Sequence, residues 1–398
     1  MKVGVFLGDL DPTAGGAHTY AGTIINGIRD HGARHEFLFF SYGEAQPAGS
    51  GGNRFVRLRA KKRSRSLVSR LSTAARRSRH GRQRPGPLDA AARDHGIELM
   101  WFPTLAWEHV NAPFIYTIWD LQHRLQSFFP EVSVTGYTFE QREADYQHIC
   151  PRAAMLIVPN LALKQEVQLF YGLPAERIVT LPQPTPDFAL AHAADAAHLP
   201  TRSLGQDYLF YPAQFWPHKN HVALLHALSL LKECHGLRSR LILTGSDKGN
   251  LAHVRATAER LGVLDQVEFS GFVKQERLVE LYQGAFVLAF PSFFGPENMP
   301  PMEAFALGCP VVAAQVSGSE HQLGDAALLF DPRSEKQICA QLLRLEREPG
   351  LRQSLIKRGL NRAQAWTGRE FIESLLSVID DFAPIRRCWS SDMPYIHT

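Results

Sequence analysis

The chain has 398 residues, of which 45% are hydrophobic and 21% charged, and its net charge is +4. This composition excludes disordered and fibrous classes and leaves enough chain for two or three globular domains. The five cysteines are scattered without metal-site or CxxC spacing, and no apolar run approaches the roughly 18 residues of a membrane span. Acids interrupt the N-terminal stretch too early for a signal peptide, so we expect a cytoplasmic protein.

Strands and helices are predicted to alternate through the first half of the chain. An apolar run, Lys2–Leu7, is followed by Gly15 and Gly16 and then by an amphipathic helix that ends near Gly32. The glycine pair lets backbone approach a ligand closely, although an ordinary turn between strand and helix explains it equally well. Further strands are predicted at Glu36–Tyr42, Glu98–Phe102, Pro113–Ile118, Ala153–Val158 and Ile178–Leu181. The alternation is typical of a doubly wound parallel sheet.

Residues 54–84 differ from the rest of the chain because they hold thirteen Lys and Arg residues and no acid. The remainder of the chain therefore has a net charge near −9. Three interpretations remain open. The segment is a patch for an anionic membrane surface, a nucleic-acid patch, or a solvated loop. We expect no nucleic-acid partner, since no aromatic residues for base stacking are interspersed and no binding motif is present.

A proline-rich stretch, Pro182–Gly205, is predicted to be a linker, after which the alternation restarts. We expect an N-terminal domain over 1–185, a linker over 186–205, a C-terminal domain over 206–375, and a helix end and tail over 376–398. A long helical pattern covers Glu335–Phe382. The second set of strands is predicted at Tyr208–Tyr211, Leu241–Thr244, Val267–Phe272, Val287–Phe290 and Pro310–Ala314. Two such α/β domains facing across a cleft are the predicted architecture.

A strand–turn–helix–strand unit over 287–314 contains the first candidate site residue. Its helix is predicted to begin at Pro300-Pro301 and to carry Glu303 in its first turn. The unit places the helix N-terminus at the carboxyl edge of a parallel sheet, where such sheets bind ligands and where free N–H groups suit a phosphate. Glu303 is suited to hydroxyl groups such as those of a ribose. Alternatively, it merely complements the helix dipole.

Two further loops lie at the same predicted sheet edge. The stretch 210–221, FYPAQFWPHKNH, brings Lys219, which can neutralise a diphosphate, and Asn220, which suits a helix cap. The loop 245–249, GSDKG, offers Lys248 as additional positive charge. The alternative for Lys219 is a lysine that faces solvent.

These residues resemble the donor-binding segments of retaining glycosyltransferases of the GT-B fold, in particular glycosyltransferase family 4 (group 1). The C-terminal half carries the resemblance, which rests on Pro291-Ser292, Pro300, Glu303-Ala304, Ala306, Gly308, Pro310–Val312 and Lys219. Two positions depart from the family. Gly295 stands where the family has its first Glu, with Glu297 two residues later, and Gln214 stands where it has an Arg.

The resemblance implies a nucleoside-diphosphate sugar as donor, retention of anomeric configuration, and a leaving phosphate that helps to deprotonate the acceptor. No metal or other cofactor is expected. The family's His-Asp pair corresponds to Trp119 and Asp120, and His123 is a candidate for the lost imidazole. The predicted catalytic residues are Glu303, Lys219, Asp120 and His123. The predicted donor-binding residues are Gly15, Gly16, Gln214, Asn220, Gly245, Lys248, Glu297, Asn298 and Met299.

We therefore expect a hexosyltransferase, with a mannose- or rhamnose-like sugar, that acts on a glycan in surface polysaccharide synthesis. A lipid-linked acceptor would place the enzyme at the inner membrane face through residues 54–84. The alternative is a catalytically silent GT-B scaffold or partner protein, suggested by Gly295 and Gln214. A nicotinamide-dependent oxidoreductase is disfavoured because no GxGxxG follows the first strand.

Overall fold

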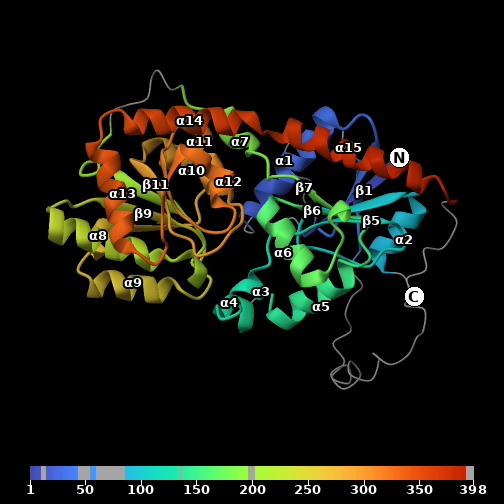
Figure 1. The fold of residues 1–398 in the computed structure, drawn as a ribbon, viewed down its shortest axis with the longest axis horizontal. Helices are drawn as coiled ribbons and strands as arrows, with labels where there is room; N and C mark the ends of the chain where they lie inside the picture. Colours follow the sequence, from blue (N-terminus) through green and yellow to red (C-terminus); the bar gives the residue numbers. More distant parts are fainter. Residues whose placement is uncertain (10–14, 44–53, 60–85, 135–136, 196–201, 391–398) are drawn as a thin grey trace. The chain divides into compact units, whose positions relative to one another are not determined.

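The computed structural model describes residues 1–9, 15–43, 54–59, 86–134, 137–195 and 202–390. Within these residues the chain forms two parallel β-sheets flanked by helices (Figure 1). The predicted α/β class with two doubly wound sheets is confirmed. Most of the basic segment (60–84), part of the predicted linker (196–201) and the tail (391–398) lie outside the described residues.

The first sheet has seven strands in the order β3-β2-β1-β4-β5-β6-β7. Most of them are short apolar runs, as expected for parallel strands that are buried on both faces. β1 pairs in parallel with β2 and β4, so that Val5 lies opposite Phe39 on one side and Trp101 on the other. β3 was not predicted, because its sequence, RFVR, lies in the basic segment. The strands are β1 (Lys2–Gly8), β2 (Glu36–Ser41), β3 (Arg54–Arg57), β4 (Leu99–Phe102), β5 (Phe114–Thr117), β6 (Met155–Val158) and β7 (Ile178–Thr180).

The helices of this part of the chain have clear local causes. α6 begins after Asn160, whose side chain accepts a hydrogen bond from the Leu163 N–H at 3.0 Å, and it ends at Gly172 in the left-handed region. The helices are α1 (Gly16–His31), α2 (Pro87–Asp94), α3 (Gln122–Leu125), α4 (Pro130–Ser133), α5 (Phe139–Ile149) and α6 (Leu161–Tyr171).

The second sheet has six strands in the order β10-β9-β8-β11-β12-β13. α8 packs against α9 and α13, whereas α11 packs against α14, and Figure 1 shows these two groups on opposite faces of the sheet. The strands are β8 (Tyr208–Pro212), β9 (Arg240–Thr244), β10 (Val267–Gly271), β11 (Val287–Phe290), β12 (Val311–Ala314) and β13 (Ala327–Phe330), of which β13 was not predicted. α7 (Asp187–Ala191) precedes β8, and the helices between the strands are α8 (His221–His235), α9 (Leu251–Arg260), α10 (Gln275–Gly284), α11 (Met299–Ala306) and α12 (Ser319–Leu323).

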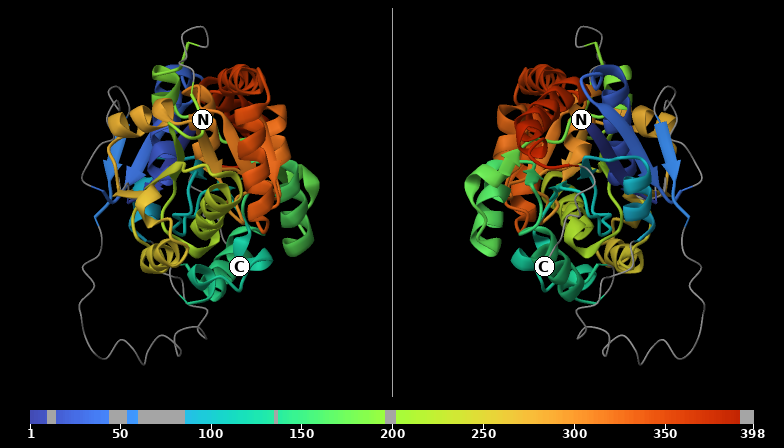
Figure 2. Two further views of the ribbon diagram at one scale, coloured as in Figure 1. Left: turned by 90° about the vertical axis from the view of Figure 1, so that its left-hand side faces the viewer. Right: turned by 90° about the vertical axis from the view of Figure 1, so that its right-hand side faces the viewer.

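The long helical pattern over Glu335–Phe382 consists of three helices. They are α13 (Glu335–Arg347), α14 (Leu351–Ala365) and α15 (Gly368–Arg386), and Figure 2 shows α15, in red, from two further sides. Gly350 separates the first two because its φ of 77° lies in the left-handed region that favours glycine. In the described part of the chain, no helix combines the length and apolar character needed to cross a membrane.

The chain divides into two compact units. The first contains Met1–Thr117, Ala153–Met155 and Leu376–Thr398, and the second contains Ile118–Arg152 and Leu156–Leu375. This division differs from the domain boundaries predicted near residues 185 and 206. Those boundaries separate the strands of the first sheet from those of the second, and they stay a prediction. It also assigns the end of α15 to the first unit. The segment 118–152, which follows β5, belongs to the unit that holds the second sheet.

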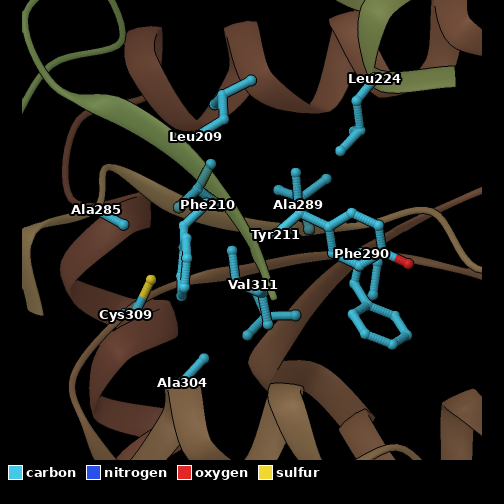
Figure 3. Packing of buried hydrophobic residues seen from close by; sticks show 14 of the residues in the cluster. Leu209, Phe210, Tyr211, Leu224, Ala285, Ala289, Phe290, Ala304, Cys309 and Val311 are labelled. Atoms are coloured by element: carbon cyan, nitrogen blue, oxygen red, sulfur yellow. The ribbon is translucent and has the colours of Figure 1, made fainter. Parts of the chain in front are cut away.

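The core of the second unit fixes the position of α11. Figure 3 shows Ala304 of α11 together with Phe210, Cys309 and Val311, all of them within one cluster of buried residues. None of the four is more than 2% exposed. Because protein interiors are close-packed, the helix cannot shift without opening a void, and its polar residues are held at fixed positions.

All five cysteines are free thiols, and they fall into two groups. Cys150, Cys309 and Cys339 are buried, whereas Cys234 and Cys388 are exposed. Burial raises the pKa of the Cys309 thiol to about 12, so this side chain behaves as a small apolar core residue.

Candidate functional site

Lys219 lies in the loop between β8 and α8, at the end of a 3-10 turn over Pro217–Lys219. Its ammonium nitrogen is 5.6 Å from the centre of the Phe290 ring and has no hydrogen-bond or ion-pair partner among the described residues. Burial lowers the pKa of Lys219 to about 8, although the charges of Asp120 and Glu131 oppose this shift. The Lys219 side chain is therefore mostly protonated at neutral pH, and no counter-ion contacts it among the described residues.

Asn220 does not cap α8 through its side chain, contrary to expectation. Its backbone is left-handed, with φ 54°, and its side-chain Nδ2 donates to the carbonyls of Pro291 and Pro332 at 3.1 and 2.9 Å. The Phe293 N–H donates to the His218 carbonyl at 2.9 Å. These bonds tie the loop that carries Lys219 to the loop that leads into α11.

Glu303 lies on α11 and is 6% exposed. Its Oε2 accepts a hydrogen bond from the Tyr282 hydroxyl at 2.6 Å, whereas Oε1 has no hydrogen-bond partner among the described residues. Burial raises the pKa of Glu303 to about 7, and the Tyr282 hydrogen bond opposes the rise. A ligand hydroxyl that donated to Oε1 would favour the ionised form.

The N-terminus of α11 offers few N–H donors. The helix begins at Met299, so Pro300 and Pro301, which have no N–H, occupy its second and third positions. The N–H of the preceding residue, Asn298, donates to the Gln322 side chain at 3.0 Å, and Gln322 donates back to the Asn298 carbonyl at 2.7 Å. Met299 is therefore the one residue in the first three helical positions with an N–H, so charge neutralisation depends more on Lys219.

The loop before α11 does not restore the carboxylate that the family pattern places at position 295. Gly295 has φ 137°, and a Cβ there would lie 2.4 Å from the Asn298 side chain. The Glu297 carboxylate accepts the Gln183 N–H at 2.6 Å. Burial raises the pKa of Glu297 well above its usual range, against the opposing effects of Gln183 and Arg362. Glu297 thus contacts the chain beyond β7, and its predicted role in donor binding stays untested.

The loop after β9 packs closely on the stretch that precedes Lys219. Gly245 has φ 144°, and a Cβ there would lie 2.3 Å from the Ala213 carbonyl oxygen. Lys248 is exposed and lies 5.9 Å from the centre of the Trp216 ring. The Trp216 indole N–H donates to the Gln214 side-chain oxygen at 3.0 Å. Gly245 is thus needed for packing, whereas Lys248 stacks on an aromatic ring at the surface.

Asp120 and His123 have different surroundings. Asp120 Oδ1 accepts the Gln122 N–H at 2.9 Å and pairs with Arg142 at 2.7 Å. Burial acts to raise the pKa of Asp120, but the Arg142 charge and these hydrogen bonds lower it overall. His123 is fully buried, and its Nε2 lies 3.3 Å from both the Tyr171 hydroxyl and Glu143. Burial lowers the pKa of His123 to about 4, so the ring is neutral at pH 7.

The structure thus brings Asp120 into the electrostatic surroundings of Lys219 and holds His123 among side chains of α5 and α6. Gly15 and Gly16 belong to the first unit, where Gly15, with φ 65°, precedes α1 and its carbonyl accepts the His18 N–H. The catalytic and donor-binding roles of all these residues remain predictions. In the described residues no group of three or more His, Cys, Asp or Glu is arranged to hold a metal.

Sequence reasoning missed two residues of this region, Tyr282 and Glu131. The hydroxyl of Tyr282 reaches Glu303 from the end of α10, and no spacing rule predicts that packing. Glu131 hydrogen-bonds His218, which lies 87 positions away in the chain. The sequence signal nearest to Glu131 is the Phe-Phe-Pro run before it, which indicates a turn and nothing about its partner.

Comparisons with known proteins agree with this architecture. Residues 200–362 match the family model for glycosyl transferases group 1. The O-antigen chain mannosyltransferase B of Escherichia coli is 30% identical over 223 residues, which cover 54% of this chain and 56% of the relative. The match thus spans little more than half of that relative's length.

Two solved structures share the fold over nearly the whole chain. Sucrose-phosphate synthase from Thermosynechococcus elongatus has a TM-score of 0.73 at 18% identity, covering 97% of this chain and all of that one. HepE of Anabaena, in complex with UDP and glucose, has a TM-score of 0.69 at 15% identity, with coverage of 96% and 99%. This chain has the GT-B fold, and its residues 200–362 are similar to the glycosyl transferases group 1.

Proposed function

We propose that this protein is a retaining glycosyltransferase that moves a hexose from a nucleoside-diphosphate sugar to a glycan. The observation that carries the proposal is the Lys219 ammonium, which is charged, partly buried and without a hydrogen-bonding or ion-pairing partner among the described residues. A desolvated cation of this kind is stabilised by an anion. The diphosphate is the anion that the donor and the released nucleotide have in common.

The proposed chemistry needs charge neutralisation at the leaving group. As the bond between the sugar and the diphosphate breaks, negative charge grows on the phosphate oxygen, and a preorganised cation stabilises that charge. Lys219 supplies the cation, and Glu303 Oε1 accepts a hydroxyl of the nucleoside. The leaving phosphate takes the proton of the acceptor hydroxyl on the same face of the sugar, so no dedicated base is required.

The identity of the sugar is proposed from the relatives. The E. coli protein is named as a mannosyltransferase of the O-antigen chain, which supports a mannose- or rhamnose-like hexose and a role in surface polysaccharide synthesis. For this chain we propose a lipid-linked glycan as acceptor. Exposed apolar side chains at Leu125, Phe128 and Val134 in the α3–α4 region support contact with a lipid.

The test of the proposed function is a screen of nucleoside diphosphates and their sugars by thermal shift, followed by turnover of the donors that bind. We expect one base and one sugar to stabilise the protein, and the glycosidic product to keep the anomeric configuration of the donor in its NMR spectrum. An inverted product would contradict the retaining mechanism. Tight donor binding with neither transfer nor hydrolysis would favour the silent scaffold.

The membrane part of the proposal rests on residues 54–84. Each basic residue near an anionic surface contributes on the order of 1 kcal/mol. Replacing Lys61, Lys62, Arg63, Arg76 and Arg77 by Gln should therefore release the protein from anionic vesicles while transfer to a short soluble acceptor continues. Salt at about 0.5 M should weaken the binding of the wild-type protein in the same way. Wild-type protein that ignored anionic vesicles at low salt would rule out this attachment.

A further inference from the structure

A short segment of the second unit, residues 126–131, lies against the loop that carries Lys219 and against the loop before α11. The Gln126 side-chain amide donates to the Phe293 carbonyl at 3.0 Å. The Phe129 ring lies 6.2 Å from the His218 ring and 6.1 Å from the Phe293 ring, centre to centre. The segment therefore contacts both the loop that carries the lysine and the loop that leads into α11.

Glu131 ends this segment and is 8% exposed. Its Oε1 accepts the backbone N–H of His218 at 3.1 Å and hydrogen-bonds the Nδ1 of the same residue. Its Oε2 is shielded from solvent and has no hydrogen-bond partner among the described residues. The Glu131 charge also acts on the neighbouring Lys219. One oxygen thus anchors the side chain, while the other is a buried acceptor without a donor.

An unsatisfied buried carboxylate oxygen is costly, and native structures keep few such atoms without a reason. An anchoring role alone accounts for Oε1 and leaves Oε2 unexplained. Oε2 has almost no exposed surface, so a ligand hydroxyl would satisfy it after a small shift of the side chains that cover it. The neighbouring cation favours a ligand that carries an anion as well. A sugar joined to a diphosphate has both groups, and its hydroxyls are hydrogen-bond donors.

We infer that Glu131 Oε2 accepts a hydrogen bond from a hydroxyl of the donor's sugar while Lys219 holds the diphosphate. The inference rests on the proposed function and adds a residue that determines sugar specificity. Glu131 would thereby supply, from its place beside His218, a carboxylate that position 295 lacks. The carboxylate is positioned by His218 and takes no part in proton transfer.

The test compares Glu131→Gln with Glu140→Gln, the same substitution at an exposed residue of the same unit. Calorimetric titration measures the affinity for the nucleoside diphosphate and for the matching nucleotide sugar. We expect E131Q to lose about 10- to 150-fold affinity for the nucleotide sugar, the range of a charge-assisted hydrogen bond. Its affinity for the bare diphosphate should stay within about twofold, and E140Q should match the wild type in both titrations.

Nucleotide sugars that each lack one hydroxyl of the sugar identify the hydroxyl that Glu131 contacts. One deoxy donor should bind the wild type as weakly as the intact donor binds E131Q, and E131Q should not distinguish the two. Equal losses for diphosphate and sugar nucleotide would show a purely anchoring role and overturn the inference. If E131Q does not fold, Glu131→Asp provides the same comparison with a shorter carboxylate. A wild-type protein that bound none of the nucleotides would instead overturn the proposed function itself.

Discussion

Two buried glutamates, one on α11 and one on α4, show how local donors set the charge of an acid. Glu303 and Glu131 are 6% and 8% exposed, so burial opposes ionisation of both. Glu303 receives one hydrogen bond, from Tyr282, and its pKa rises to about 7. For Glu131, burial also acts to raise the pKa, but hydrogen bonds and charge from His218 lower it overall. At neutral pH Glu131 is an anion, whereas Glu303 is divided between its two forms.

The difference suggests different responses to a ligand. Glu131 is already charged and needs a donor for its free oxygen, so binding should change its protonation little. Glu303 would lose its proton as a hydroxyl donated to it, so its contribution should depend on pH. Lys219 lies in the loop that contacts Glu131 through His218 and the loop before α11 through Asn220. Changes to Lys219 should affect the binding of every ligand that contains a diphosphate.

Replacing the cation should have the largest effect. In Lys219→Ala the growing charge on the leaving diphosphate loses its main cationic partner, and we expect kcat/KM to fall by about 100- to 1000-fold. Affinity for the free nucleoside diphosphate should fall as well, because the product carries the same charge. Steady-state kinetics and calorimetric titration measure the two effects. Unchanged diphosphate affinity would show that Lys219 does not contact the ligand.

Glu303→Gln should reduce transfer by about 10- to 150-fold, because it removes a charge-assisted hydrogen bond. The measurement is kcat/KM at subsaturating donor between pH 6 and 9. Transfer by the wild type should decline towards pH 6 as Glu303 gains its proton, and the variant should lack this decline. Near-normal turnover by the variant would show that Glu303 has a structural role alone.

The two glutamates should affect stability with opposite dependence on pH. Folded Glu303 keeps its proton to about pH 7, whereas the unfolded chain releases it near 4.5. The free energy of unfolding of the wild type should therefore fall by about 3 kcal/mol relative to that of Glu303→Gln as pH rises through this window.

The pKa of Glu131 is lowered, so the stabilisation that Glu131 provides is lost as pH falls below 4.5 towards its folded pKa. Urea unfolding of wild type, E303Q and E131Q at several pH values tests both signs. Parallel pH profiles would contradict the assigned shifts.

The smallest expected effect is at Lys248, the second lysine near this region. Its exposed ammonium stacks on Trp216, an interaction of about 0.5–1 kcal/mol. We expect Lys248→Ala to change diphosphate affinity and kcat/KM by no more than about fivefold, which makes it a control for Lys219→Ala. A loss as large as that of the Lys219 variant would assign the phosphate to Lys248 instead.

The sequence predicts features that depend on neighbouring residues. Alternating strands and helices, the start of α11 beside its proline pair, and the loop position of Lys219 follow from local periodicity and turn chemistry. Features that depend on contacts between distant segments did not follow. Asn220 was predicted as a cap but bonds two carbonyls, those of Pro291 and Pro332, that lie about 70 and 110 positions away.

The burial of side chains in the predicted site did not follow from local sequence either. His123 has the chemistry of a catalytic group, yet its ring is enclosed by Phe139 and Tyr146, which no local pattern indicates. Glu131 lacks any motif, and its orphan oxygen is visible once the fold brings it to His218. A motif thus identifies a loop, but the charge state and the partners of a side chain depend on packing.

The two exposed thiols give the chain a natural pair of attachment points for probes. Cys388 belongs to the first compact unit and Cys234 to the second, while the other three cysteines are buried. Since buried, high-pKa thiols react slowly, mild treatment with a maleimide dye should modify these two positions first. A donor and acceptor dye pair would then report by energy transfer whether the units approach each other when a nucleotide sugar binds, with no change to the amino-acid sequence.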